Sequence, residues 1–471
     1  MPPCLTRLLV VDEGHRLKNT AGSVTLRALE SLACESRLLL TATPIQNVLS
    51  DFYSIANFCC PGILGDLNIF RRDFERPIST SNQKNCTSQQ RSHGAAQARM
   101  LEDITQTFML RRLQKDVLKS MLPPRQEVML FCRPSHKQCS LYRQLTNSHR
   151  RGLEDSGATA DALKTLTSLR KLCLHPSFVD PSGDFEATDV SLSGKLAVLD
   201  QLLEQIRSIT PDDKVVIVSN FTSALDMIES SILQPRHLSC LRLDGNTELS
   251  RRQSIVDTFN NTSSERNFAF LLSSKAGGCG LNLVGANRLL MVDADFNPAS
   301  DIQAMARVYR QGQEKPCTIY RLFTSGTVEE VICQRQIQKG NLATRAVDSR
   351  KSASSPSFTK EEIRDCFTLK ENCASTTKEK LGDLWADYDG PSSIISQGCD
   401  DEPLIEIASM ASNLAFVHVV DTNAEPLTPE PTPSSIESCS ETSEEEWDDN
   451  DLMKSVDATF SSSDEEENEF E

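Results

Sequence analysis

The sequence predicts an α/β protein in which two units with parallel sheets are joined by a helical middle and followed by an acidic tail. Two observations predict it. Short apolar runs alternate with helical patterns over the first 60 residues and again from residue 193, as in parallel α/β units. Residues 351–471 carry 7 Lys and Arg against 30 Asp and Glu, whereas residues 1–350 carry 42 against 36. The acidity therefore belongs to a tail, and the body is mildly basic.

The first half begins with the continuous apolar run Leu8–Val11, which predicts a strand buried on both faces. A helical stretch follows near residues 21–33, and residues 37–40 predict a second buried strand. Gly, Ser and Gln crowd residues 79–97, which favours a surface loop. The first half then continues with a strand near 127–132 and helix from about 135 to 174.

A second series of strands and helices begins at Ser193. Amphipathic helical patterns occupy residues 195–206, 301–309 and 327–336. After about residue 350 the pattern fades, except for the apolar stretch 411–421, which either docks on the body or serves as a short linear motif. Apolar runs predict the strands of this half, and they lie in KVVIVSN, CLRLDG, FAFLLSSKAGG, RLLMVDADFNP and CTIYRLF.

Composition excludes several classes of protein. No apolar run approaches the length of a membrane span, so an integral membrane protein is excluded. The first residues lack the basic start and long apolar middle of a signal peptide. The 16 cysteines form no CxxC pair, which argues against a zinc ribbon or a disulfide framework and predicts reduced thiols. The mildly basic body permits a nucleic-acid partner without demanding one.

Polar side chains follow the first two predicted strands. Asp12 and Glu13 of VVDEGH come directly after the first strand. There an Asp can hold Mg²⁺ through water and a Glu can orient the water that attacks a γ-phosphate, although Asp-Glu-Gly can also be a simple polar turn. LTATPIQN brings Thr41, Thr43 and Gln46 to the same sheet edge, unless it is only a proline-containing loop.

Two further motifs lie in the second half. SSKAGGCGLNL follows a predicted strand, and its glycines, including Gly278 and Gly280, let the backbone approach a phosphate or another strand. An isolated glycine turn would look the same. DIQAMARVYRQGQ predicts a helix on which Gln303, Arg307 and Arg310 share a face. Such arginines either meet a γ-phosphate held by a facing lobe or form a solvated basic face.

Taken in order along the chain, the motifs resemble those of the Swi/Snf-like ATPases, superfamily-two DNA translocases with two RecA-like lobes. The resemblance covers roughly residues 5–350. DEGH, PGILG and SNFT resemble the recombination-repair branch, the Rad-fifty-four proteins, and within it the B-type paralogues. The resemblance is carried by VVDEGHRLKN, LTATPIQN, LRKLCLHP, SGKL, VVIVSN, SSKAGGCGLNL, DFNP and QAMARVYRQGQ.

The resemblance implies a role for each matching residue. Asp12 and Glu13 would be the acidic pair of the reaction, with magnesium held by Asp12 through water, and Arg307 and Arg310 would be arginine fingers. The implied nucleotide-binding and coupling residues are His15, Thr41, Thr43, Gln46, Gly278, Gly280 and Gln303. The implied DNA-contacting residues are Asn220, Ser273, Ser274 and Lys275.

The resemblance also implies an activity. It implies an ATP-dependent translocase on double-stranded DNA that acts in the nucleus, in homologous-recombination repair, on recombinase filaments and chromatin. Such an enzyme tracks a duplex through phosphate contacts and reads no sequence. The implied cofactors are ATP and Mg²⁺, with no zinc. The implied partners are double-stranded DNA, a RecA-like recombinase filament and nucleosomes, with no membrane.

The sequence departs from the family pattern in two places. A phosphate-cradling GxxxxGK[ST] loop is absent from the sequence, and the nearest match, SGKL at 193–196, lacks the hydroxyl and the upstream glycine. We therefore expect an N-terminally incomplete chain that does not hydrolyse ATP by itself. The alternative is a non-hydrolysing protein that binds DNA or protein partners. Leu174 stands where the family usually has Asn.

The expected domain organisation follows from these boundaries. The polar, acidic end of the chain cannot bury enough apolar surface to order itself, so it is expected to be disordered. The ranges are a partial first lobe at 1–134, a helical insertion at 135–192, a second lobe at 193–350, a weakly structured extension at 351–425 and the tail at 426–471.

Deletion of residues 426–471 is expected to leave the fold intact and to tighten non-specific DNA binding, most visibly at low salt. The acidic tail repels the DNA backbone, and salt screens that repulsion. The measurement compares the duplex affinities of 1–425 and 1–471 across a salt series. Equal affinities at every salt concentration would identify an inert solubilising tail instead.

Overall fold

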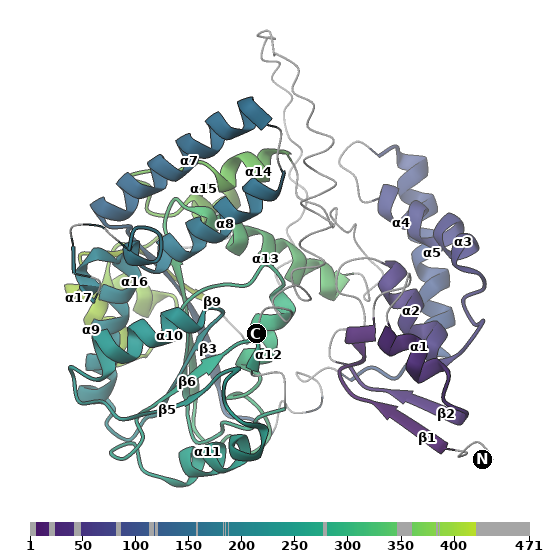
Figure 1. Cartoon of the computed structure of the whole chain (residues 1–471), viewed down its shortest axis with the longest axis horizontal. Helices are drawn as coiled ribbons and strands as arrows, with labels where there is room; N and C mark the ends of the chain where they lie inside the picture. Colours follow the sequence, from purple (N-terminus) through teal and green to yellow (C-terminus); the bar gives the residue numbers. More distant parts are fainter. Residues whose placement is uncertain are drawn as a thin grey trace. The chain divides into compact units, whose positions relative to one another are not determined.

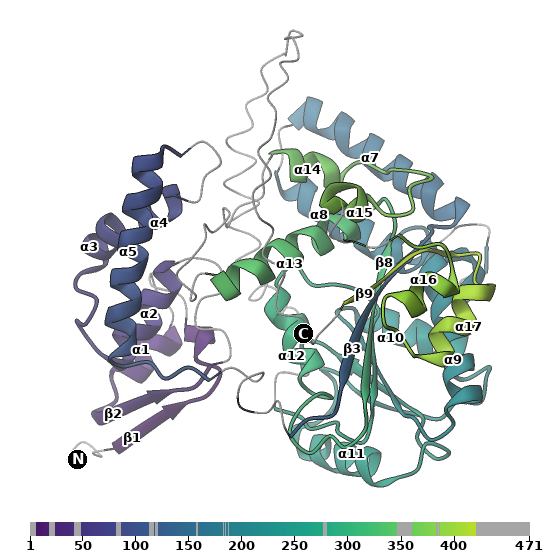
Figure 2. The same ribbon diagram turned by 180° about the vertical axis from the view of Figure 1, so that it is seen from behind.

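The structure, a computed structural model, forms two compact units. The first contains Met1–Lys119 with the short segments Asn297–Ala299 and Arg335–Ser357, and the second contains the remaining residues. Figures 1 and 2 show the chain from opposite sides. The residues described are 6–17, 24–41, 49–81, 86–112, 117, 121–156, 159–181, 183, 185–186, 188–276, 280–345, 360–382, 385 and 387–420.

The second unit is built on a sheet of seven strands in the order β5-β6-β4-β7-β8-β3-β9. Neighbouring strands are parallel, except that β9 is antiparallel to β3. This confirms the predicted α/β class with parallel sheets. The strands are β3 (Arg125–Cys132), β4 (Val215–Ser219), β5 (Cys240–Leu243), β6 (Ala269–Ser273), β7 (Arg288–Met291), β8 (Cys317–Thr324) and β9 (Leu414–Val420).

Helices cover both faces of this sheet (Figure 1). Along β4 the side chains alternate, so that Val215 and Ile217 face one core while Val216 and Val218 face the other. The continuous apolar run therefore marks a strand buried on both faces, as predicted. The first core includes α9 (Gly194–Ile209), α10 (Thr222–Ile228) and α17 (Glu402–Met410), and the second includes α11 (Leu249–Asn261) and α12 (Pro298–Met305).

The helical middle consists of α7 (His136–Ser156) and α8 (Thr159–Leu174), which contact each other. The Tyr142 hydroxyl donates to the carbonyl of Cys366 at 2.8 Å and accepts from the Val328 amide at 3.1 Å. This buried tyrosine therefore joins α7 to α13 (Val328–Arg345) and to α14 (Lys360–Cys366).

The residues after 350 contain more regular structure than the sequence led us to expect. In the described part of 360–420 lie α14, α17, β9, α15 (Thr376–Leu381) and α16 (Pro391–Ser396). The apolar stretch 411–421 docks: its strand β9 pairs with β3, from Cys132 opposite Leu414 to Glu127 opposite Val420. The strand predicted at 127–132 thus lies in the second unit's sheet, beyond the first unit's end near Lys119. The expected disordered tail at 426–471 lies outside the described residues.

The first unit contains a two-stranded parallel sheet of β1 (Thr6–Val11) and β2 (Cys34–Leu39). Its strands were predicted to be buried on both faces, and this is wrong: Leu8 is 53% exposed and Val10 49% exposed. The apolar core of this unit lies among its helices instead. These are α1 (Val24–Glu30), α2 (Leu49–Cys59), α3 (Leu67–Phe70), which a π-helical turn (Arg71–Glu75) continues into α4 (Arg76–Ser81), and α5 (Ser88–Gln106).

The surface loop predicted at 79–97 is also wrong, because the described residues there end α4 and begin α5. A capping box starts α5: the Thr87 hydroxyl accepts from the Gln90 amide at 3.2 Å, and the Gln90 side chain accepts from the Thr87 amide at 2.9 Å. A Cβ on Gly94 would lie 2.7 Å from the carbonyl oxygen of Pro77. The Ser, Gln and Gly that suggested a loop are therefore the cap and the close contact of two packed helices.

Two further expectations concern membranes and thiols. Among the described helices, none has both the length and the apolar character that crossing a membrane requires. The cysteines in the described ranges are all free, as expected of reduced thiols.

Replacing His418 with phenylalanine is expected to reduce the loss of unfolding free energy that the second unit shows as the pH is lowered. The His418 ring stacks on Trp385 with 4.0 Å between centroids, and burial lowers its pKa from 6.5 to about 4. The unfolded chain therefore takes up this proton at a higher pH than the folded one. The contribution of His418 to the free energy of unfolding is complete above pH 6.5 and is lost as the pH falls to 4 and below, by about 3 kcal/mol.

The measurement is the free energy of unfolding at several pH values between about 7 and 4.5, which spans this titration. Phenylalanine keeps an aromatic ring on Trp385, so stability at neutral pH serves as the control. Equal pH dependence in both proteins would assign the acid sensitivity to other groups.

Candidate functional site

The loops that follow β1 and β2 are joined at the carboxyl ends of these strands. The Leu40 amide donates to the Val11 carbonyl at 2.8 Å, and the Gly14 amide donates to the Leu40 carbonyl at 2.9 Å. Between them, the Glu13 amide donates to Asp12 Oδ1 at 2.8 Å. Glu13 has a φ of 51°, a left-handed conformation that is uncommon for a non-glycine residue. The turn after β1 is thus held by β2.

His15 links the acidic turn to the loop after β2. Its Nδ1 lies 3.1 Å from Thr41 Oγ1 and 3.3 Å from Glu13 Oε2. One nitrogen thus faces two oxygens, and a proton placed on Nδ1 would serve both. The structure therefore brings together four of the predicted residues, Asp12, Glu13, His15 and Thr41. Thr43 and Gln46 lie outside the described residues.

Replacing Gly14 with alanine, which would turn DEGH into DEAH, is expected to destabilise the first unit by about 1–3 kcal/mol through overpacking. A Cβ at this position would lie 2.1 Å from Leu39 Cγ. Leu39→Ala in the same chain should recover much of that loss, because it removes the atoms that clash. The measurement is a double-mutant cycle of unfolding free energies. Additive effects would contradict the proposed contact.

In the second unit, Asp293 organises the loops at the carboxyl ends of β4 and β7. It is 2% exposed and is the second residue after β7. Its carboxylate accepts from the Ser219 hydroxyl, from the Asn220 amide at 3.1 Å and from Asn220 Nδ2 at 2.5 Å. Asn220 Oδ1 in turn accepts from the Ser274 hydroxyl. Asn220 and Ser274, both predicted DNA contacts, therefore lie side by side in a fixed orientation.

The other predicted DNA contacts differ in exposure. Ser273, the last residue of β6, is 3% exposed, so its side chain lies inside the protein. Lys275 is exposed. Gly280 is exposed and has a φ of 65°, which favours glycine. Gly278 lies outside the described residues.

The helix predicted at 301–309 is shorter than expected, because α12 ends at Met305. Gln303 lies on the helix, whereas Arg307 and Arg310 lie in the turns that follow, so the three do not share one helix face. Arg307 is 8% exposed, and its carbonyl accepts from the Leu283 amide at 2.9 Å. The Arg310 guanidinium donates to the Leu281 carbonyl at 3.1 Å. The amides of Ala306 and Tyr309 still donate to the carbonyls of Ile302 and Met305, so the bonds to residues 281 and 283 are made in addition to those of the turns.

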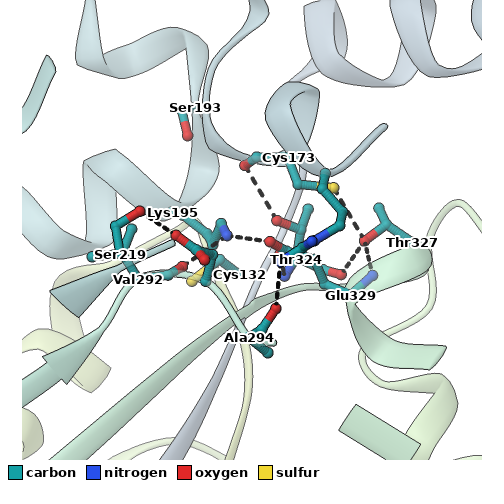
Figure 3. Close-up of polar contacts among 12 residues, drawn as sticks. Cys132, Cys173, Ser193, Lys195, Ser219, Val292, Ala294, Thr324, Thr327 and Glu329 are labelled. Carbon is teal, nitrogen blue, oxygen red and sulfur yellow. Dashed lines mark hydrogen bonds and ion pairs between the residues drawn. The ribbon is translucent and has the colours of Figure 1, made fainter. Parts of the chain in front are cut away.

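SGKL is a buried structural element at the start of α9. Ser193 caps the helix by accepting from the Leu196 amide at 3.3 Å, and a Cβ on Gly194 would lie 1.8 Å from the carbonyl oxygen of Arg133. Lys195 is 0% exposed, and Nζ donates to Glu329 at 2.5 Å and to the Val292 carbonyl at 2.9 Å (Figure 3). A lysine paired in this way is not available to a phosphate.

Two buried thiols lie in the same cluster (Figure 3). Burial raises the pKa of Cys132 and of Cys173 to about 12, so neither supplies a thiolate at neutral pH. Leu174, at the position where the family usually has Asn, is 1% exposed and belongs to the core on the α9 face. These residues therefore stabilise the fold and provide no nucleophile.

The sequence analysis missed residues that position the site. Asp293 lies in RLLMVDADFNP, Arg170 in LRKLCLHP and Lys195 in SGKL, and no positioning role was predicted for any of them. For Asp293 and Lys195 the available signal was a charged residue directly beside a continuous apolar run. Such a charge needs a partner when it is buried. The partner itself, such as Glu329 for Lys195, could not be read from local sequence.

Two models of known protein families match the sequence of this chain. A model of the SNF2-related domain matches residues 3–178, and a model of the helicase conserved C-terminal domain matches residues 194–312. The chain therefore belongs to the SNF2-type, helicase-like ATPases.

The relatives are DNA repair proteins. DNA repair and recombination protein RAD54B of Gallus gallus is 43% identical over 79% of this chain and 44% of its own length. DNA repair protein rhp54 of Schizosaccharomyces pombe is 40% identical over 79% of this chain and 45% of its own length. The chain thus spans about half the length of the curated relatives it matches. A SWI2/SNF2 ATPase core of Sulfolobus solfataricus in complex with dsDNA is 26% identical, with a TM-score of 0.43, over 77% of this chain and 73% of that one.

Proposed function

We propose that this chain is part of an ATP-dependent translocase on double-stranded DNA that acts in recombinational repair in the nucleus. The observation that carries the proposal is the cluster of Asp12, Glu13, His15 and Thr41 at the carboxyl ends of β1 and β2. The relatives' names, which specify DNA repair and recombination, support the repair context.

The donor set of this cluster fits Mg²⁺ and a nucleotide. Carboxylate and hydroxyl oxygens are the ligands that Mg²⁺ prefers, often through water. Glu13 Oε2 lies 3.3 Å from His15 Nδ1, and a carboxylate oxygen has a second lone pair that can accept from a water molecule. Asp12 would hold the ion through water and Glu13 would orient the attacking water. Bound ATP would supply the phosphoryl group, and Mg²⁺ would neutralise the negative charge on the phosphates.

His15 would couple the acidic turn to the loop after β2. Its Nδ1 faces both Glu13 and Thr41, so a shift of either loop changes the orientation of the other. This is a positioning role, because the imidazole need not touch the nucleotide. It would transmit a change at the acidic turn to residues beyond Thr41.

The duplex would be held by the carboxyl edge of the second unit's sheet. The Asn220 amide donates one of its two protons to Asp293 and has a second for a phosphate oxygen, whereas Ser274 donates its only hydroxyl proton to Asn220. Lys275 adds an exposed ammonium group. Side chains of these types bind phosphate oxygens without reading the bases. We propose, as part of the same function, that the complete protein acts on recombinase filaments and nucleosomes.

A second function for this chain is favoured by the absence of a GxxxxGK[ST] motif from its sequence. Without the loop that cradles the β- and γ-phosphates, 1–471 would bind duplex DNA or protein partners without turning over ATP. The buried Lys195 does not replace the missing lysine, since it pairs with Glu329.

The test measures ATP hydrolysis and duplex binding by purified 1–471, each with Glu13→Gln as the matched variant. We expect salt-dependent duplex binding by both chains and no DNA-stimulated hydrolysis by either. DNA-stimulated turnover that Glu13→Gln abolishes would overturn the second function and leave the translocase. Absence of duplex binding at low salt would overturn the DNA surface.

A further inference from the structure

The five residues after β7, 292–296, are each held by a partner from another part of the second unit. This segment is called the β7 loop below. The Asp295 amide donates to Asp301 Oδ1 at 3.2 Å. The other partners are Lys195 for Val292, Ser219 and Asn220 for Asp293, and Arg170 for both Ala294 and Phe296. A loop held at every residue has few alternative conformations.

Arg170 fastens the middle of the β7 loop. Its guanidinium donates to the Ala294 carbonyl at 2.9 Å. It also lies over two rings, with its Cζ 5.1 Å from the centroid of Phe221 and 5.0 Å from that of Phe296. Phe221 follows Asn220, so a single side chain of α8 holds the loop after β4 and the loop after β7 together.

Lys195 fastens the start of the β7 loop. It lies entirely within the protein, and Nζ donates to the Val292 carbonyl at 2.9 Å while pairing with Glu329. Figure 3 shows Lys195, Val292, Ala294 and Glu329 in one cluster. Arg170 and Lys195 therefore hold the carbonyl groups on either side of Asp293.

We propose that Arg170 and Lys195 are positioning residues for duplex binding: they fix Asp293, which together with Ser274 fixes Asn220 in the orientation that meets the phosphate backbone. The inference rests on the proposed function of this edge. Asn220 has its amide nitrogen bound to Asp293, and its amide oxygen accepts from Ser274. Neither Arg170 nor Lys195 contributes its own charge to the DNA.

The experiment measures affinity of 1–471 for a duplex across a salt series. The variants are Arg170→Met, the paired Lys195→Met/Glu329→Gln, Asn220→Ala and the combination of Arg170→Met with Asn220→Ala. The paired change removes both buried charges together, so that it does not leave Glu329 without a partner. Arg236→Met is the matched control, because Arg236 pairs with Asp200 and Glu204, away from the β7 loop.

We expect Arg170→Met, the paired variant and Asn220→Ala each to weaken binding, on the order of five-fold, the worth of about one hydrogen bond. The combination of Arg170→Met with Asn220→Ala should be no weaker than either change alone, because both act through the same contacts. The slope of log affinity against log salt should stay unchanged. Faster amide exchange at Asn220 and Asp295 in Arg170→Met should accompany the loss, with the strand β4 protected as before.

Three results would overturn the inference. A salt slope reduced by about one in Arg170→Met would make Arg170 a direct phosphate contact. Additive losses in the combined variant would separate Arg170 from Asn220. Full affinity in Arg170→Met and the paired variant, with weakened binding in Asn220→Ala, would leave the proposed function standing and remove only the positioning role. If Asn220→Ala also binds normally, the DNA surface itself is wrong.

Discussion

Replacing Arg307 or Arg310 with alanine is expected to lower DNA-stimulated ATP turnover about a thousand-fold, the usual worth of an arginine finger. The protein for this test is a chimera in which a segment that carries a GxxxxGK[ST] loop, taken from an active SNF2-type ATPase, precedes this chain. Arginine fingers stabilise charge that develops on the transferred phosphoryl group, so their loss affects turnover much more than binding.

The structure gives the two arginines different surroundings, which sharpens this test. Arg307 is buried, at 8% exposed, whereas Arg310 is half-buried. The Arg310 guanidinium donates to the carbonyls of Gly280 and Leu281. A loss of turnover with DNA affinity and melting temperature unchanged would support the finger role for either residue. Arg236→Ala is the matched control. A fall of only a few-fold would show that the residue does not act as a finger.

Replacing Lys195 with methionine is expected to destabilise the second unit by about 3–5 kcal/mol, the cost of leaving one member of a buried ion pair without its partner. Lys195 is 0% and Glu329 2% exposed as side chains. Glu329 would keep only the Thr324 amide, which donates to Oε2 at 2.8 Å. The free energy of unfolding in urea measures the loss.

The paired variant Lys195→Met/Glu329→Gln provides the control for that result. Because both charges are removed, the paired variant should lie within about 1–2 kcal/mol of the unaltered chain. A single variant as stable as the paired one would mean that Glu329 is not charged in the fold. Such a result would require a different account of how α9 is joined to α13.

Local patterns predicted the second unit well because its strands are continuous apolar runs. Val215–Ser219 is buried on both faces by α9 and α11, so its sequence carries the signal along its whole length. The strand near 127–132 was predicted as a strand but assigned to the first lobe, since nothing local shows that it pairs with β8 and β9. The local sequence therefore predicted that a segment forms a strand, but it did not predict which strands that segment pairs with.

The residues that fix the site were harder to predict for the same reason. Asp12 and Glu13 stood out because two carboxylates follow a strand directly. Arg170 and Ala294 are 124 residues apart in the chain, and only the fold brings them to 2.9 Å. Arg307 and Arg310 were placed on a helix by their spacing, but α12 ends at Met305 and the chain continues in turns, where the two arginines bond to residues 283 and 281.

The antiparallel pairing of β9 determines the edge of the sheet at which the described part of the second unit ends. Val420 ends β9 opposite Glu127, near the amino end of β3, whereas Asn220 and Ser274 lie at the carboxyl end of the sheet. The acidic residues after 420 are thus tethered at the edge opposite the proposed DNA surface. If the proposed surface binds DNA, negative charge attached at the opposite edge would turn the molecule before contact is made. Acidic residues attached there would then change the rate of encounter differently from the affinity.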